Sequence, residues 1–189
     1  LVATYIFLSL AVLLALAAFS AGAGRTVSVR QPGETLSGAA LLRRNPQFCW
    51  FLASSVLLYA AHMMAITYMD AIVGRAGGTE AELGLAVAVG AAAEFPAMAL
   101  LQRIRRRFSA KQILLFSAVS FAVKLLCLAA AVSMTWVYLA SLLQLAAYSL
   151  FTGMSVYYVT DVVDPANQAK GQALCSGAST VGAVLGNYA

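Results

Sequence analysis

Long apolar runs separated by short polar segments set the pattern of this sequence. Each run is about twenty residues long, which as a helix rising 1.5 Å per residue is near the length that crosses about 30 Å of hydrocarbon. The pattern predicts an all-α polytopic membrane protein with six transmembrane helices. They cover roughly residues 1–22, 47–69, 83–102, 112–132, 135–159 and 168–189.

The last run is rich in glycine, and its Gly182 and Gly186 form a GxxxG pattern. This pattern permits close approach of helices, although it is common by chance in such a composition. The chain starts without methionine in one apolar run and stops within another, so we expect it to be an internal fragment of a longer protein.

Basic residues gather in alternate loops. The segment after the first run carries Arg25, Arg30, Arg43 and Arg44, and the segment 103–111 carries four arginines and Lys111. The loops between them carry either more acids than arginines or no charge. Because loops rich in Lys and Arg stay in the cytoplasm, these basic loops are predicted to be cytoplasmic. The longer basic segment, 23–46, is expected to link one helix (1–22) to a block of five (47–189).

Composition agrees with a lipid environment. The chain is 62% hydrophobic and 10% charged, whereas a soluble domain carries about 25% charged residues. The net charge of +5 lies in the loops, so a membrane-lipid partner is expected and no nucleic acid. The stretch "RIRRRFSAKQ" could be a lipid-binding or nucleic-acid patch, but a topogenic loop is the simpler interpretation. No metal, nucleophile–base or phosphate-loop motif occurs, so we expect no cofactor, no metal and no enzyme.

Two ionisable residues interrupt the apolar runs at similar depth. Glu94 lies about eleven residues into the third helix, and Lys124 about twelve residues into the antiparallel fourth. Insertion of a charged side chain at that depth of the membrane costs about 2.5–3.5 kcal/mol. Such groups therefore face a cavity or each other. One hypothesis makes them a proton-coupling site, since a buried carboxylate can take up a proton near neutrality unless the lysine holds it ionised. The alternative is a structural ion pair that fixes helix register. Pro96 beside Glu94 removes a backbone donor and can kink the helix.

Further polar residues recur at helical spacing on other runs. A stripe on the fifth helix suits either a wet pathway or hydrogen bonding in a dry interface. Gln144 and Tyr148 are its strongest members as substrate contacts, and Tyr59 and His62 on the second helix are further candidates. A lone histidine is more often a buried residue whose hydrogen bonds are satisfied. The stripe comprises Ser141, Gln144, Tyr148, Thr152 and Ser155, and Asp70 is expected at the outer end of the second helix.

These residues together resemble a known family. The ordered segments "EFP", "LLQRIRRRFSAKQILLF", "AVKLL" and "YYVTDVVDPANQAKGQAL" are similar to the C-terminal half of major facilitator superfamily transporters. The similar branch holds phenylpropionate permease and the oligosaccharide– and nucleoside–proton symporters. The matching residues are Glu94 and Pro96, the loop 103–111, Lys124, and Pro165, Ala169, Gly171 and Gln172.

The resemblance implies helices six to eleven of a twelve-helix transporter, with the linker 23–46 between two six-helix bundles. It further implies alternating access around a midplane site, a proton-coupled sugar, nucleoside or aromatic-acid substrate, and multi-pass location in a bacterial inner (cell) membrane. Several features depart from the family. The loop 103–111 lacks the usual Asp and glycines, Lys124 stands where Arg is common, and the stretch "QLAAYSL" lacks the His and Glu of lactose permease. The alternatives are an integral-membrane enzyme, for which Asp161 and Asp164 are the nearest candidates, and a non-transporting membrane sensor.

Overall fold

The computed structural model describes residues 35–188, which are almost entirely helical and contain no strand. The predicted helix 1–22 and the first part of the linker 23–46 lie outside the described residues. The elements in order are α2 (Gly38–Arg44), α3 (Pro46–Thr67), α4 (Met69–Arg75), α5 (Glu80–Arg105), α6 (Ala110–Ala129), α7 (Met134–Leu142), the π-helical turn η2 (Leu145–Ser149), α8 (Leu150–Val162), the 3₁₀ turn η3 (Pro165–Asn167) and α9 (Gln168–Tyr188).

Four helices are long and apolar enough to cross a membrane. They are α3, α5, α6 and the combined α7–η2–α8, Met134–Val162, and they coincide with the second to fifth predicted spans. The last predicted span also forms a helix, α9, but it is not among these four because glycine, serine and glutamine replace much of its aliphatic content. The structure therefore shows four apolar spans in the described part of the chain.

Local capping explains where two of the four spans, α5 and α6, begin. Thr79 and Glu82 form a capping box at the start of α5, in which Glu82 Oε2 accepts the Thr79 backbone N–H at 2.8 Å. Ser109 and Gln112 repeat the same arrangement at the start of α6. Each box satisfies backbone donors that a helix start would leave unpaired. As a result, α5 begins three residues earlier than the pattern predicted and α6 two residues earlier.

The second span ends earlier than expected. α3 stops at Thr67, and Asp70 lies in the separate short helix α4 rather than at the outer end of the second helix. Pro96, by contrast, does not end its helix, because α5 continues on both sides of it. Its effect is local, since proline supplies no N–H to the helix ladder.

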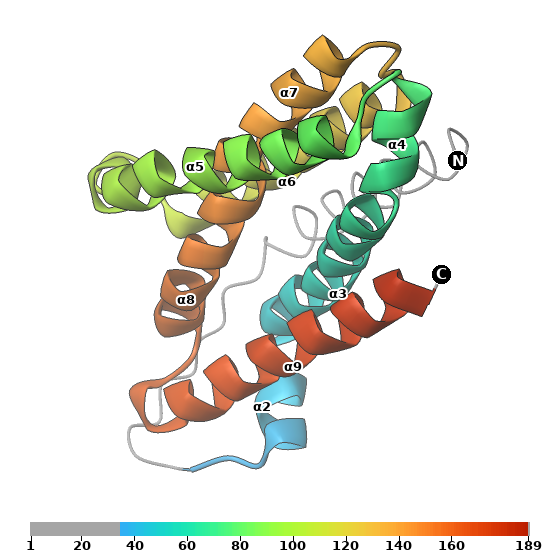
Figure 1. Cartoon of the computed structure of the whole chain (residues 1–189). Coiled ribbons are helices and arrows are strands. Elements are labelled where there is room, and N and C mark those ends of the chain that lie inside the picture. Colours follow the sequence, from blue (N-terminus) through green and yellow to red (C-terminus); the bar gives the residue numbers. More distant parts are fainter. Residues whose placement is uncertain (1–34, 189) are drawn as a thin grey trace.

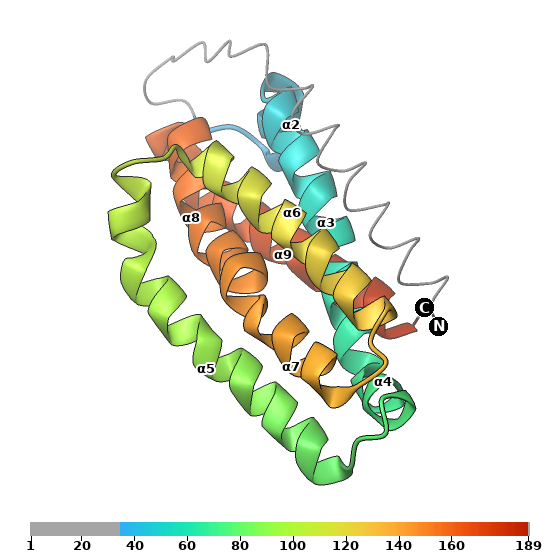
Figure 2. The same cartoon turned by 90° about the horizontal axis from the view of Figure 1, so that it is seen from above.

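The spans form two groups (Figures 1 and 2). In one group α7–η2–α8 lies between α5 and α6, with which it makes most of its contacts. In the other, α3 runs beside α9, in the closest helix pairing of the described residues. The pairing uses the GxxxG pattern, because a Cβ atom at Gly182 would meet the Val56 carbonyl oxygen and one at Gly186 would meet that of Ala60. Only glycine allows the two backbones this separation.

Candidate functional site

A cavity of about 430 Å³ lies between α3, α4, α5, α6 and α7. It reaches from Glu94, in the middle of α5, to Thr67 and Asp70, which are exposed at the ends of the bundle opposite the arginine-rich loop. By the charge of the loops, that end is the predicted outer side. The polar side chains that line the cavity are His62, Glu94, Lys124, Ser141, Gln144 and Tyr148, besides Thr67 and Asp70 at its outer end.

Gln144 joins the two predicted charges. Its side-chain nitrogen donates to Glu94 Oε1 at 3.1 Å, and its carbonyl oxygen accepts a hydrogen bond from Lys124 Nζ. Lys124 is 7% exposed and Gln144 9% exposed, whereas Glu94 is half-buried. Lys124 makes no ion pair with any residue of the described chain. The direct Glu94–Lys124 ion pair considered from the sequence is therefore replaced by a bridge through a neutral amide.

Aromatic rings form a second wall. The His62 imidazole stacks on the Tyr148 ring with centroids 4.2 Å apart and planes inclined by 18°, and it makes a T-shaped contact with Phe121. Tyr59 packs edge-on against Tyr148 at 6.0 Å, and its hydroxyl lies 3.5 Å from Thr152 Oγ1. These contacts hold the Tyr148 ring in one orientation at the cavity surface.

Two buried polar atoms of the cavity have no hydrogen-bond partner among the described residues. They are His62 Nδ1 and Ser141 Oγ, on side chains 2% and 3% exposed. Leaving such groups unpaired costs about 1–3 kcal/mol each, so native proteins rarely do so without a reason. Within the described part of the chain, His62 Nδ1 therefore lacks the hydrogen bond that is expected of a lone buried histidine. Both residues line the cavity, and the two unpaired atoms themselves lie beneath its surface.

A π-helical turn sets the positions of Gln144 and Tyr148. η2 begins directly after Gln144 and widens the helix over Leu145–Ser149. Ser149 Oγ donates to the Gln144 carbonyl oxygen at 3.3 Å, and Ser117 of α6 donates to the Ala147 carbonyl oxygen within the turn. Single π turns are frequent at functional sites because they change the direction of side chains along a helix.

Of the six predicted site residues, five lie on this cavity: Glu94, Lys124, Gln144, Tyr148 and His62. Tyr59 lies behind Tyr148 and contacts the cavity through it. The roles of these residues remain predictions. Gly90 was missed as a lining residue, and so was the contact that Ser117 makes with the π turn. A Cβ atom at Gly90 would lie 3.7 Å from the Ser141 carbonyl oxygen, which is an ordinary contact distance. Nothing in a single helix distinguishes this glycine from the others.

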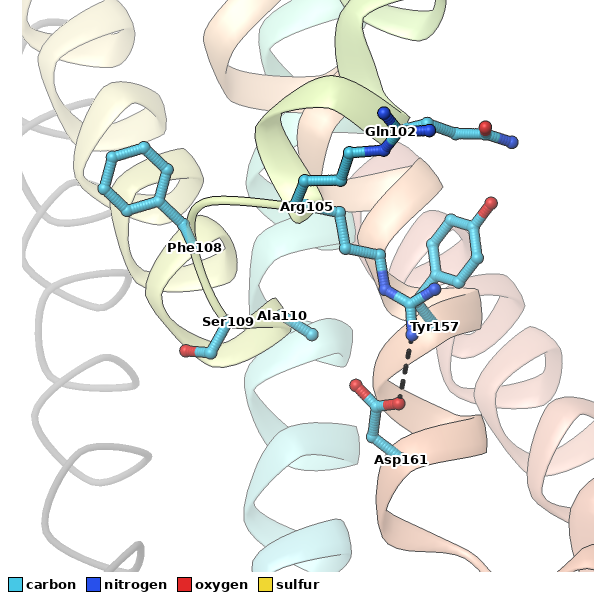
Figure 3. A pocket seen from close by; sticks show the side chains of 8 residues that line it. Gln102, Arg105, Phe108, Ser109, Ala110, Tyr157 and Asp161 are labelled. Atoms are coloured by element: carbon cyan, nitrogen blue, oxygen red, sulfur yellow. Dashed lines mark hydrogen bonds and ion pairs between the residues drawn. The ribbon is translucent and has the colours of Figure 1, made fainter.

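A second cleft, of about 620 Å³, lies at the opposite, predicted cytoplasmic end (Figure 3). Its wall includes the loop after α5 and the last turns of α8. Arg105 Nη2 lies 3.2 Å from Asp161 Oδ1, and the guanidinium carbon sits 4.1 Å above the Tyr157 ring. Asp161 thus pairs with an arginine from α5. This ion pair gives a structural role to Asp161, one of the two residues that the enzyme alternative would use.

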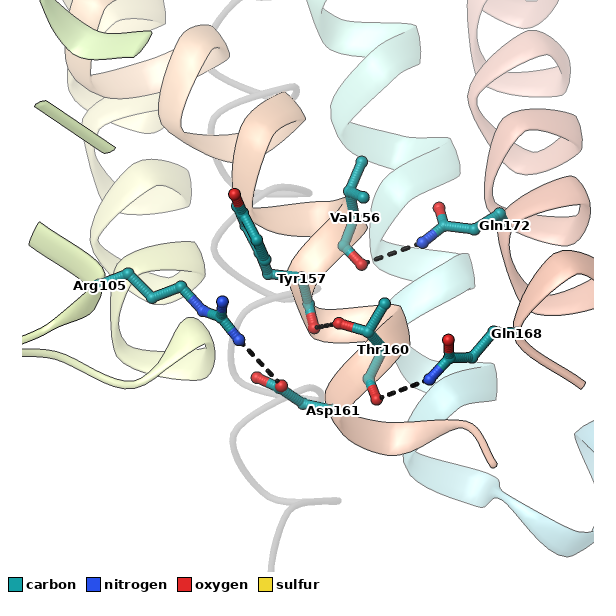
Figure 4. A network of polar contacts seen from close by, with 7 residues as sticks. All are labelled: Arg105, Val156, Tyr157, Thr160, Asp161, Gln168 and Gln172. Carbon is teal, nitrogen blue, oxygen red and sulfur yellow. Dashed lines mark hydrogen bonds and ion pairs between the residues drawn. The ribbon is translucent and has the colours of Figure 1, made fainter. Parts of the chain in front are cut away.

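Amide side chains of α9 extend the contacts at this end of the bundle (Figure 4). Gln172 Nε2 donates to the Val156 carbonyl oxygen at 3.0 Å, and Gln168 Nε2 donates to that of Thr160 at 3.3 Å. Gly171 packs so closely on Val159 that a Cβ atom there would lie 2.8 Å from its Cγ1. The "PANQAKGQ" segment therefore joins the ends of α8 and α9.

The chain matches the MFS_1 like family over residues 1–189. It therefore belongs to this family of the major facilitator superfamily, which makes it a multi-pass membrane protein and points to the transport of a small molecule across the membrane. No curated protein and no solved structure matches the sequence.

Proposed function

We propose that this member of the MFS_1 like family moves a small solute together with a proton, by alternating access. The observation that carries the proposal is the Glu94–Gln144–Lys124 bridge on the wall of a cavity between the apolar helices. The proposal places the protein in the cell membrane, as its resemblance to the transporter family implies. Sugars, nucleosides and aromatic acids, the classes implied by the resemblance, are the proposed substrates.

Glu94 is the proposed proton-binding group. Its carboxylate is half-buried on the cavity wall and accepts one hydrogen bond from a neutral amide, with no cation at ion-pairing distance in the described chain. A carboxylate held by a direct lysine contact would stay charged, whereas one held through an amide can exist in both protonation states. That reversibility is what a coupling residue needs.

The distribution of contacts supports alternating access. The cavity extends from Glu94 to exposed residues at the predicted outer end. At the other end, Arg105–Asp161 and the α9 glutamines join α5, α8 and α9 (Figures 3 and 4). Access from the cytoplasm requires that these contacts open and that the outer ends approach each other. The Arg105–Asp161 pair is proposed as one contact that changes in the cycle.

Replacement of Glu94 by Gln tests proton coupling. Proteoliposomes carrying the protein would be loaded with a pH-sensitive dye and given a panel of sugars, nucleosides and aromatic acids. Glu94→Gln is isosteric and keeps the contact with Gln144, so we expect solute exchange to continue while solute-driven proton movement is lost.

Glu80→Gln is the matched control, because Glu80 is exposed in the first turn of the same helix and does not line the cavity. This variant should behave like the unmodified protein. Proton movement that persisted unchanged in Glu94→Gln would show that the coupling role belongs elsewhere.

A further inference from the structure

From the charges around the cavity we infer that its substrate is a small organic monoanion, a carboxylate, carried with one proton so that transport is electroneutral. This inference rests on the proposed function and specifies its substrate. The structural basis is a buried ammonium group, Lys124, whose hydrogen bond goes to an amide rather than to an acid.

The Lys124 ammonium group has more hydrogen-bond donors than the described residues accept. An ammonium group has three donors, and in the described chain one of them goes to the Gln144 carbonyl oxygen. A buried cation needs an anionic or strongly polar partner to offset its desolvation. Ser141 of α7 also lines this cavity, and its hydroxyl has no hydrogen-bond partner among residues 35–188. A carboxylate bound in this cavity would receive hydrogen bonds from the remaining donors of the Lys124 ammonium group.

The other titratable groups of the cavity do not neutralise Lys124 by contact. Glu94 reaches it only through Gln144. Asp70 is exposed at the outer end of the cavity, where water screens it. His62 and Tyr148 are stacked on one another. Lys124 is the only lysine or arginine among the residues described as lining the cavity.

Protonation of Glu94 therefore changes what the cavity can hold. With Glu94 charged, the carboxylate and the ammonium balance each other across the amide. With Glu94 protonated, one uncompensated positive charge remains in a space of low polarity. The proton and a carboxylate substrate then favour each other's binding, and by linkage the effect is reciprocal. One proton and one monoanion carry no net charge.

The remaining wall suits the organic part of such an anion. Leu83, Ala86, Val87 and Leu128 line the cavity together with the aromatic face of Tyr148. A volume of about 430 Å³ lies within the range of about 300–1,000 Å³ that is usual for small-molecule sites. The site is therefore shaped for an apolar body with one charged end.

Matched pairs of acids and amides test the substrate class. Thermal stabilisation of the purified protein would be measured at pH values on both sides of neutrality with benzoate and benzamide, propionate and propionamide, and lactate and lactamide. We expect at least one carboxylate to stabilise the protein, more strongly at acidic pH, and its amide to do so at about tenfold higher concentration or not at all.

Two variants of α6 show whether the preference depends on Lys124. Lys124→Gln should remove the preference for the acid, whereas Lys111→Gln, which deletes a positive charge at the cytoplasmic end of the same helix, should keep it. Lys124→Arg keeps the charge and should retain the preference, and it serves as the test if Lys124→Gln does not fold. Equal binding of acid and amide, no binding of any carboxylate, or an unchanged preference in Lys124→Gln would overturn the inference.

Transport of the acid that binds tests electroneutrality. Uptake into proteoliposomes should follow an imposed pH gradient and be unaffected when potassium and valinomycin impose a membrane potential. Uptake that responds to the potential but still requires Glu94 would overturn the electroneutral monoanion and leave proton coupling intact. Uptake indifferent to both the pH gradient and Glu94→Gln would instead contradict the proposed function.

Discussion

Gln144 contacts Glu94 across the space between α7 and α5, with 3.1 Å between its side-chain nitrogen and the carboxylate oxygen. The same amide accepts a hydrogen bond from Lys124 of α6. Three spans are thus connected at one side chain, and the neutral residue determines how strongly the two charged ones interact.

Replacement of Gln144 by Leu should reduce uptake more than any other neutral change in the cavity. Leucine has about the same side-chain size as glutamine, but it leaves Lys124 and Glu94 without their described hydrogen-bond partner. An unpaired buried polar group costs about 1–3 kcal/mol. We expect initial uptake to fall by about tenfold or more, as measured in proteoliposomes. Thr180→Val removes one bond to a backbone carbonyl of its own helix, outside the cavity, and should retain most of the activity; equal losses in both variants would refute the special role of Gln144.

Ser117 should act on the site through the π turn. Its hydroxyl donates to the Ala147 carbonyl oxygen, one residue before Tyr148, and Ser117→Ala leaves that buried carbonyl short of a donor. We expect the apparent affinity for substrate to weaken by several-fold, about 1 kcal/mol, with a smaller effect on expression and melting temperature.

Ser120→Ala is the control for this change. Ser120 lies one turn further along α6, but it donates to Phe116 in its own helix, at 2.9 Å. If Ser120→Ala weakened apparent affinity as much as Ser117→Ala, the contact with the π turn would not be the cause.

The Arg105–Asp161 contact should matter more for transport than for stability. Their side chains are 38% and 48% exposed, and exposed ion pairs contribute about 0–1 kcal/mol. We expect Arg105→Gln and Asp161→Asn each to lower the free energy of unfolding by less than about 1 kcal/mol while changing the uptake rate, because the proposed alternating access requires this contact to open and close.

Combining the two substitutions separates the pair from the individual residues. If the contact itself controls the rate, Arg105→Gln has little further effect once Asp161→Asn is present. Additive effects on uptake in this double-mutant cycle would mean that the residues act independently.

Gly182 and Gly186 should be intolerant of larger side chains. A Cβ atom at either position would meet an α3 carbonyl oxygen, and overpacking typically costs about 1–3 kcal/mol. We expect Gly186→Ala to lower thermal stability in detergent, whereas Gly177→Ala, where nothing lies within 4 Å, should leave stability unchanged or raise it slightly. Equal melting temperatures would show that α9 can move away from α3 at little cost.

The spans and the polar residues within them could be predicted from sequence because both depend on local composition. A charge in about twenty apolar residues is visible whatever surrounds it, which is why Glu94 and Lys124 could be identified. Helix ends were less predictable. The end of α3 at Thr67 and the separate α4 depend on backbone geometry around Tyr68, which the hydrophobic pattern does not record.

The connections between these residues depend on tertiary structure. That Gln144 stands between Glu94 and Lys124 follows from the packing of α7 between α5 and α6 and from the π turn that follows it. Arg105 and Asp161 are 56 residues apart in sequence, and no local pattern pairs them. Hydropathy and charge act residue by residue and therefore determined the membrane class, the spans and the candidate charges, whereas contacts between helices exist only once the chain has packed, and they alone decided which side chains share a cavity.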